Sequence, residues 1–315
     1  MRPTFSIIAF TTLSGIGYGL WFIVGLGLAV GVSIDTSRFA FGFALVAGAL
    51  FASAGLLASV AHLGKPLRAW RAFSQWRSSW LSREAIVALA TYVPALAIGA
   101  QLVSGSDAGI TLRLLGALLA ALSVSTVTCT ARIYSSLPPI RAWANRYTLP
   151  SYLLLGAFAG ALWFCALHAS MVDDARESSF ALAVLIANAI AIAPAAGWVK
   201  RSYWRHIDAL APIGAGTATG LSKLGTVRSF EQPHTEENYL TREMGFVLAR
   251  KHAHKLRALA FWTILSTPLA SIALHMLIGR PGFWMAAIVG SAAVFVERWL
   301  FFAEAKHAVA GYYAR

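Results

Sequence analysis

The sequence predicts an all-α integral membrane protein, a bundle of eight transmembrane helices with one cytoplasmic loop insertion. Of its 315 residues, 58% are hydrophobic and only 12% are charged, and the mean hydropathy is +0.64. A soluble domain usually carries about 25% charged residues. Apolar runs of about 20 residues, the length that crosses a bilayer, recur along the chain. We therefore expect a single polytopic membrane domain over residues 1–315.

Eight segments meet this length rule, and all are rich in Ala, Leu, Gly and aromatic residues, as is typical of helices that pack closely in lipid. The first is too long for the apolar part of a signal peptide and is expected to be a span. Pro94, Pro194 and Pro268 lie inside the third, sixth and seventh segments, where neighbouring helices can satisfy the freed carbonyls. The predicted helices are approximately Phe5–Val30, Phe39–Ala61, Ala85–Val103, Leu112–Ile133, Pro150–His168, Phe180–Val199, Ala258–Ile278 and Gly282–Phe302.

The charges of the loops predict the orientation. Every second loop is strongly basic, whereas the loop between the fifth and sixth helices is net acidic, and the remaining loops are short and nearly neutral. Because cytoplasmic loops of membrane proteins carry an excess of Lys and Arg, the basic loops and both termini are expected in the cytoplasm. The same rule accounts for the formal net charge of +13, so nucleic acid is not an expected partner. The basic loops carry Lys65, Arg68, Arg71, Arg77 and Arg83; Arg132, Arg141 and Arg146; and Lys200, Arg201, Arg205, Arg250, Lys251, Lys255 and Arg257.

The loop insertion covers about residues 200–257 and is the one sizeable polar segment. It contains a Gly-rich, turn-prone stretch at Gly214–Gly220 and a run at Thr241–His254 that favours a helix. Because so short a segment buries little core of its own, we expect an ordered cytoplasmic cap and not a separate domain.

Four histidines lie in or near the spans: His62 and His307 close to the cytoplasmic face, His168 and His275 close to the outer face. Facing histidines at one depth are what a bis-His haem requires. Interfacial histidines without a cofactor account for the pattern equally. Each candidate lies at a helix end, so no haem is expected. The sequence has no CxxC pair, so the chain is not expected to hold an iron–sulfur cluster by itself.

Two carboxylates interrupt the spans. Glu84 opens the third helix, and Glu297 follows the apolar run Gly282–Val296 in the eighth, beside Arg298. An ionisable residue at such depth is a functional candidate and is expected to face the bundle interior. The alternative is a structural ion pair of Glu297 with Arg298 or with an Arg of a neighbouring helix.

His62, Glu84 and Glu297 are predicted at one depth on the cytoplasmic side, which suits a quinone site. A quinone head group lies at the membrane interface, its oxygens need hydrogen-bond partners, and two protons move with two electrons. A histidine that titrates near neutrality and a buried carboxylate are suitable proton carriers. A helix cap is the alternative for His62, and topology with an interfacial aromatic belt is the alternative for the basic, Trp-rich loop.

The segment His62–Glu84 closely resembles the membrane anchor subunits of DMSO reductase-type complexes, the DmsC family. The likeness lies in His62-Leu63-Gly64-x-Pro66-x-Arg68-Ala69 and in Ser79–Glu84 (SWLSRE). Three further stretches are similar to one branch, the anchor of cytoplasmic sulfite dehydrogenase. They are Thr130–Tyr134 (TARIY), Leu137–Trp143 (LPPIRAW) and Glu236–Met244 (EENYLTREM).

The resemblance implies a heterotrimer in the bacterial inner membrane, in which an iron–sulfur electron-transfer subunit and a molybdopterin catalytic subunit join this anchor. Those cofactors then belong to the partner subunits, and haem is usually lacking. A histidine and a glutamate around this loop support quinol binding in the family, and by motif position they correspond to His62 and Glu84. Glu297 has no family role and rests on its depth alone.

We therefore expect a quinone-reactive anchor that passes electrons between the iron–sulfur subunit and the quinone pool, with sulfite oxidation reducing ubiquinone or menaquinone as an exchangeable substrate. A second possibility is the reverse direction, in which quinol is oxidised for a DMSO reductase-type terminal reductase. A third is a secondary transporter, which would require an internal repeat and charges near the midplane. The residues expected to dock the iron–sulfur subunit are Arg68, Arg71, Arg77, Arg83 and Arg141.

Overall fold

The computed structural model describes residues 4–32, 38–61, 63–105, 109–171, 179–211, 214–228, 230–231 and 248–308. Over these residues the chain forms helices and turns and no strand, and eight helices are long and apolar enough to cross a membrane. The all-α membrane bundle is thereby confirmed. Its spans are α1 (Phe5–Ala29), α2 (Arg38–Ala61), α3 (Trp80–Ser104), α4 (Gly109–Ser135), α5 (Thr148–Met171), the composite Phe180–Asp208, α10 (Leu248–Ile278) and α11 (Pro281–Ala303).

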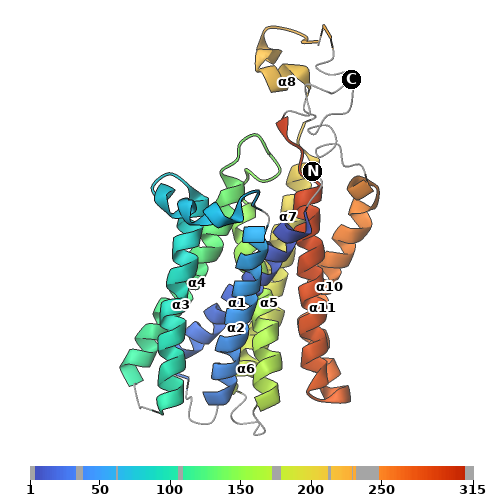
Figure 1. Cartoon of the computed structure of the whole chain (residues 1–315). Helices are drawn as coiled ribbons and strands as arrows, with labels where there is room; N and C mark the ends of the chain where they lie inside the picture. Colours follow the sequence, from blue (N-terminus) through green and yellow to red (C-terminus); the bar gives the residue numbers. More distant parts are fainter. Residues whose placement is uncertain are drawn as a thin grey trace.

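Helix α1 forms the centre of the bundle. It packs against α2, α4, α5 and α11, while α3 pairs with α4 on one side and α10 with α11 on the other (Figure 1). The close approach of α1 to α5 depends on glycine, because a Cβ at Gly19 would lie against the carbonyl of Gly156. Small residues let helix backbones approach in this way when lipid, not water, surrounds them.

The sixth span is not a continuous α-helix. It consists of α6 (Ser179–Ala187), a π-helical turn η2 (Asn188–Ile192) and α7 (Ala193–Asp208). Pro194 opens α7 and has no N–H to donate to the preceding turn, so the wider turn absorbs the missing bond. The buried Asn188 of this turn donates to the carbonyl of Phe158 on α5, at 3.2 Å.

The short elements gather at one end of the bundle. A 3-10 helix η1 (Pro66–Gln75) connects α2 to α3, and α8 (Ala215–Thr219) and the turn η3 (Leu221–Lys223) follow α7. The start of α1 and the finish of α11 lie at this same end (Figure 1), which we call the η1 end. The predicted helix at Thr241–His254 is helical from Leu248 onward, and its first part lies outside the described residues.

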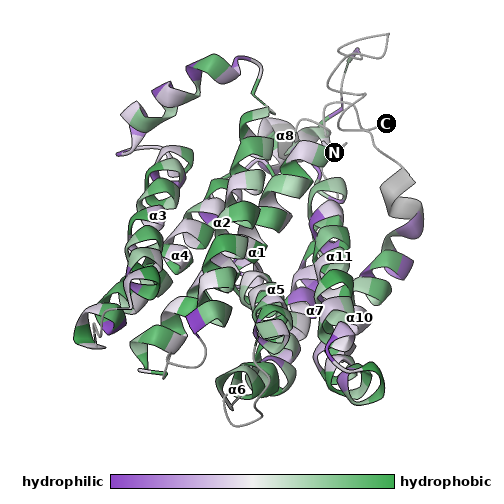
Figure 2. Cartoon of the chain, turned by 60° about the horizontal axis from the view of Figure 1, so that its bottom comes forward, coloured by the Kyte–Doolittle hydropathy of each residue, from purple (hydrophilic) through white to green (hydrophobic). Residues whose placement is uncertain are grey.

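Hydrophobic residues predominate along the spans, whereas η1 alternates hydrophilic and hydrophobic residues (Figure 2). Outward-facing side chains such as Val93, 67% exposed, and Trp262, 65% exposed, would be an aggregation hazard in water. Lipid covers such surfaces, which agrees with a multi-pass membrane protein.

Candidate functional site

Glu84 lies one turn inside the start of α3, where the basic loop joins the membrane bundle. The Ser79 hydroxyl caps this helix by accepting from the backbone N–H of Ser82 at 3.4 Å. Starting the helix at Trp80 directs Glu84 inward, so that the side chain is 4% exposed. A carboxylate is rarely buried without partners, so its contacts decide what it can do.

The contacts of Glu84 come from α4. Its Oε1 accepts a short hydrogen bond from the Thr130 hydroxyl, and that hydroxyl also contacts the carbonyl of Thr126 at 3.1 Å. One turn deeper, the hydroxyls of Thr126 and Thr91 lie 3.3 Å apart. These groups form a narrow polar layer between α3 and α4. It can hold a proton donor or acceptor in a fixed position at the membrane boundary.

The histidine predicted to join Glu84 lies just before η1. His62 falls outside the described residues, so its distance from Glu84 stays a prediction. Its described neighbours are Ala61, which ends α2, and Leu63, which is exposed.

The loop itself presents cations and aromatic rings to the outside. Arg68, Arg71 and Arg77 are exposed. The guanidinium of Arg71 lies 5.6 Å from the Trp70 ring centroid, and that of Arg77 lies 5.4 Å from the Trp76 ring. Such cation–π contacts hold the charges outward without neutralising them.

Arg83 has a different role from the other loop arginines. Its Nε donates to the carbonyl of Trp76 at 2.9 Å and its Nη2 to the carbonyl of Arg77 at 2.5 Å, while the guanidinium lies 4.4 Å from the Trp80 ring. These bonds fasten the end of the loop onto α3, directly beside Glu84.

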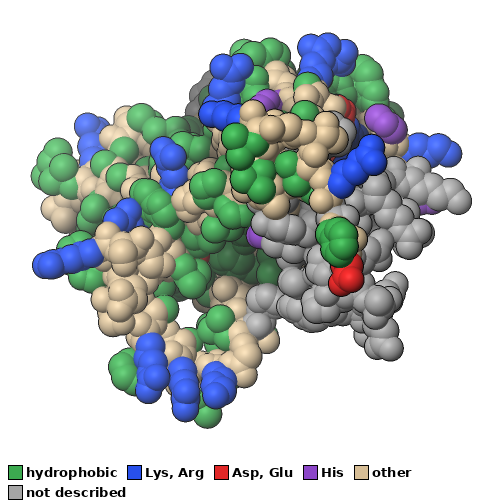
Figure 3. All heavy atoms as spheres, turned by 90° about the horizontal axis from the view of Figure 1, so that it is seen from above, with side chains coloured by type: hydrophobic (Ala, Val, Ile, Leu, Met, Phe, Trp, Pro, Cys, Tyr) green, Lys and Arg blue, Asp and Glu red, His purple; other side chains and the backbone are tan. Residues whose placement is uncertain are grey.

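Arg141, the remaining predicted docking residue, lies in the connection between α4 and α5. Its Nη2 donates to the carbonyl of Ala211 at 3.0 Å. It also lines a pocket of about 300 Å³ together with Asp208, Arg257 and Glu304. Seen from above, Lys and Arg side chains stand in several groups on this end of the molecule, and acidic side chains show at few places in the described part (Figure 3).

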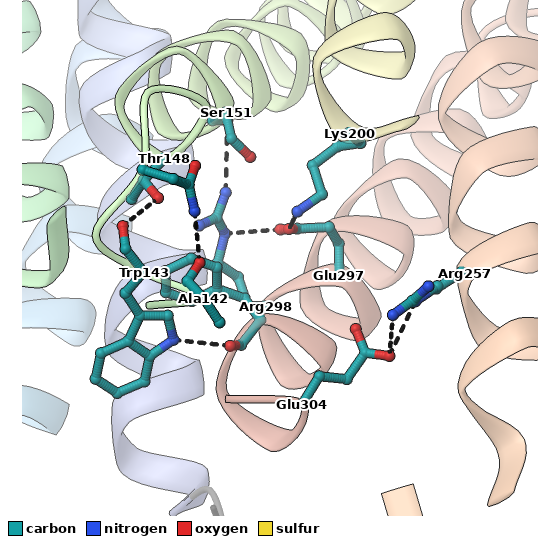
Figure 4. Close-up of polar contacts among 11 residues, drawn as sticks. Ala142, Trp143, Thr148, Ser151, Lys200, Arg257, Glu297, Arg298 and Glu304 are labelled. Carbon is teal, nitrogen blue, oxygen red and sulfur yellow. Dashed lines mark hydrogen bonds and ion pairs between the residues drawn. The ribbon is translucent and has the colours of Figure 1, made fainter. Parts of the chain in front are cut away.

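Glu297 of α11 lies in a buried charge cluster (Figure 4). Its Oε1 contacts the Lys200 ammonium of α7 and its Oε2 lies 3.0 Å from Arg298 Nε, with all three side chains at most 2% exposed. The Arg298 guanidinium lies 3.8 Å from the Tyr152 ring centroid, and its Nη2 is 3.5 Å from the carbonyl of Ser151. Glu297 thus faces the bundle interior, with one cationic partner on α7 and one on its own helix, α11.

Lys200 lies elsewhere than the sequence predicts. The apolar run ends at Val199, which predicts a loop position for Lys200, but α7 continues to Asp208 and the ammonium is buried. The helical spacing of Lys200, Tyr203 and Trp204 is a usable signal in the sequence, because all three lie on one buried face. The ammonium stands 3.9 Å from the Tyr203 ring centroid.

A second charge group lies nearer the surface. Arg257 of α10 bonds Asp208 at 2.7 and 3.0 Å and Glu304 at 2.9 Å. Glu304 follows the end of α11, and burial raises the pKa of its carboxyl above the ordinary value although Arg257 opposes this shift. Asp208 is 54% exposed, so the group reaches from solvent to the buried cluster.

Two of the histidines considered for haem, His168 and His275, have aromatic neighbours. His168 is buried on α5 against Phe164, with ring centroids 5.6 Å apart, and His275 stacks on Phe283 at 4.5 Å. Within the described ranges no group of three or more His, Cys, Asp and Glu side chains is arranged to hold a metal ion.

Comparison with known proteins shows the family of this chain. The family model described as DMSO reductase anchor subunit (DmsC) matches residues 1–208. The chain is also 31% identical over 330 aligned residues to a sulfite dehydrogenase subunit of Allochromatium vinosum, with 99% of each chain covered. The part of the chain that the family model matches includes Glu84, Thr130 and Lys200, while the alignment with the relative covers the whole bundle.

Proposed function

Because this chain belongs to the DMSO reductase anchor subunit (DmsC) family, we propose that it anchors an oxidoreductase complex in the membrane and exchanges electrons with quinone there. Membership of a family of anchor subunits favours this role over a secondary transporter. The observation that carries the quinone proposal is the buried Glu84 carboxylate, which is held by Thr130 at the membrane boundary beside η1.

The chemistry needs two electrons and two protons for each quinone reduced to quinol. The electrons come from an iron–sulfur subunit docked at the η1 end, and the protons come from side chains at the quinone. Glu84, fixed by Thr130, donates a proton to one quinone oxygen or accepts a hydrogen bond from the quinol. His62, which precedes the same loop, serves the other oxygen. Ubiquinone or menaquinone is thus an exchangeable substrate, and haem takes no part.

Docking of the iron–sulfur subunit falls to the exposed cations of η1 and the turn that follows it. Arg68, Arg71 and Arg77 are exposed, so an acidic partner surface can meet them. Arg83 and Arg141 bond backbone carbonyls of this chain, and they shape the docking surface while contributing charge to it.

The relative supports a proposal for the direction of electron flow and for the catalytic partner. Because the relative belongs to a sulfite dehydrogenase, we propose that a molybdopterin subunit oxidises sulfite and that quinone is reduced. Both partner subunits then lie on the cytoplasmic side of the bacterial inner membrane, as the basic loops predict. The family description favours a second candidate, in which quinol is oxidised for a DMSO reductase-type enzyme.

Substitutions at the two site residues test the proposal in the intact complex. In Glu84→Gln and His62→Ala, quinone-linked turnover should fall at least about 100-fold, as expected for a lost acid or base. Activity with an artificial dye and co-purification of the partner subunits should persist. Glu231→Gln, at an exposed position, is the matched control. Near wild-type quinone turnover in both variants would refute the site.

The same preparation distinguishes the two directions. Assays with sulfite and with DMSO on the co-purified complex should show sulfite-dependent quinone reduction. Quinol-dependent reduction of DMSO without sulfite activity would establish the second candidate instead.

A further inference from the structure

We propose that the protons used at Glu84 travel through a buried path from the η1 end, which runs from the pocket at Asp208 and Glu304 through the Lys200–Glu297–Arg298 cluster to a water-holding cavity at Thr130. This inference rests on the proposed quinone chemistry at Glu84. It names the route that the protons take to Glu84 and the residues that form this route.

The inner end of the path is a small cavity between α1, α4, α5 and α11. Its volume is about 10 Å³, and its wall includes Thr12, Thr130 and Arg298. A space of roughly 10–15 Å³ holds one water when two or more polar partners surround it. Thr130 is the residue that bonds Glu84, so a water here lies one hydroxyl away from the carboxylate.

The cavity wall supplies the polar partners. Thr12 Oγ1 and Arg298 Nη1 are buried, and within the described part of the chain neither has a hydrogen-bond partner. Leaving buried polar atoms unpaired is unfavourable, because their hydration is lost without a replacement. A water in the cavity would accept from Arg298 and bond both hydroxyls, so the site fits water better than an apolar group.

The cavity leads to Glu297 through Arg298. Arg298 lines the cavity, and its guanidinium contacts Glu297 Oε2 at 3.0 Å through Nε. Arg298 keeps its own proton, because a guanidinium stays charged in proteins. Figure 4 shows the Arg298 guanidinium in contact with Glu297. The proton carriers on this part of the path are therefore the water and the Glu297 carboxylate, and Arg298 positions them.

The outer end of the path opens at the η1 end of the bundle. Lys200 contacts Glu297 and also interacts electrostatically with Glu304. Glu304 lines the pocket of about 300 Å³ with Asp208 and Arg257. Burial raises the pKa of the Glu304 carboxyl, so this group takes up a proton at a higher pH than an ordinary glutamate does, which suits a group that accepts protons from solvent.

The charges along the path alternate in sign. Asp208, Glu297 and Glu304 stand among Lys200, Arg257 and Arg298, so the six groups have no net charge when all are ionised. Each carboxylate can take up a proton while its cationic neighbours stay in place. For each proton that Glu84 passes to a quinone oxygen, one proton moves from the cavity water through the Thr130 hydroxyl to Glu84, and Glu297 gives one to that water. Glu297 then takes a proton from the Lys200 ammonium, Lys200 takes one from Glu304, and Glu304 takes one from solvent. The electrons come from the partner subunit, so the step is balanced.

The test uses the intact complex, with Glu297→Gln and Glu304→Gln compared with Glu231→Gln. Quinone-linked turnover should fall at least about tenfold in the first two variants and its solvent deuterium isotope effect should rise, because proton delivery becomes limiting. Dye-linked activity and partner co-purification should stay at the wild-type level. Unchanged turnover with an unchanged isotope effect in Glu297→Gln would overturn the path.

A second variant keeps the test decisive if Glu297→Gln fails to assemble. Thr12→Val removes a hydroxyl from the cavity wall and keeps the side-chain shape. It should lower quinone turnover severalfold and raise the isotope effect, whereas unchanged values overturn the path. Glu84→Gln separates the two proposals: if that variant is inactive with quinone but the path variants are normal, the path alone is wrong. If Glu84→Gln is fully active, the quinone site itself is wrong.

Discussion

Lys200 of α7 and Glu297 of α11 form an ion pair inside the bundle, with side chains 1% and 0% exposed. Burying one charge alone is strongly unfavourable. The pair has two further neighbours: the Arg298 guanidinium contacts Glu297, and the ring of Tyr203 lies beside the Lys200 ammonium. The contact joins two spans that are far apart in sequence.

Breaking this pair on one side should destabilise the protein. Lys200→Met leaves Glu297 with one cation fewer, and removal of one partner of a buried pair typically costs about 3–5 kcal/mol. Glu297→Gln should cost more than Lys200→Met, because it leaves Lys200 and Arg298 both buried without a carboxylate. Adding Lys200→Met to Glu297→Gln should recover part of that loss, because one of the two unpaired cations is then removed. Thermal unfolding of the purified protein in detergent measures all three variants. A double variant less stable than Glu297→Gln would contradict the coupling.

Thr130 should control the quinone reaction through Glu84. Thr130→Val removes the donor to the carboxylate without changing the side-chain shape, so quinone-linked turnover should fall severalfold. Steady-state kinetics with a short-chain quinone measure the effect. Ser125→Ala, at an exposed position of the same helix, is the control and should behave like wild type.

The exposed cations at η1 should set the affinity for the partner. Charge reversal at Arg68, Arg71 and Arg77 together should weaken binding of the iron–sulfur subunit at least about tenfold, with the largest loss at low salt. Binding measured at several salt concentrations tests this. Arg113→Glu, exposed at the opposite end of the bundle, should leave the affinity unchanged, and an equal loss there would argue against docking at η1.

The contact between α1 and α5 should not tolerate a side chain at Gly19. Gly19→Ala places a methyl group against the carbonyl of Gly156, so the two helices must separate and the melting temperature should fall. Gly15→Ala, on the same helix, meets no atom within 4 Å and should be neutral or slightly stabilising. Equal effects of the two changes would mean that the close approach is unimportant.

The raised pKa of Glu304 should appear in the pH dependence of stability. Its proton is bound more tightly in the folded protein, so the stabilising contribution is complete below the ordinary carboxyl value of about 4.5 and is lost as the pH rises through the raised pKa. The melting temperature of the wild type should therefore decline relative to that of Glu304→Gln as the pH increases above about 4.5.

Much of the fold could be predicted from the sequence because a bilayer imposes strong local rules. Apolar length alone located all eight spans, and Pro94 and Pro268 lie within helices as expected. The sixth span is predicted as one helix, and the π-turn before Pro194 could not be predicted from hydropathy, since it depends on how the freed backbone is satisfied.

The candidate site was less predictable from the sequence than the fold. Motif position and a carboxylate at the start of a span predicted Glu84 as a site residue, and that role stays a prediction. The depth of Glu297 predicted a side chain that faces the interior, and the structure buries it. The partners of these carboxylates could not be identified in the same way, because Thr130 comes from another helix and Lys200 follows the end of its apolar run.

The sequence by itself determined the membrane class, the number of spans and the basic loops, because these follow from local composition measured against the thickness of a bilayer. Only the tertiary structure decided which charges meet. Thr130 reaches Glu84, and Lys200 reaches Glu297, through the packing of helices separated by many residues. Which side chains pair across helices depends on the rotation and the depth of each helix. Composition does not determine these two quantities, whereas close packing does.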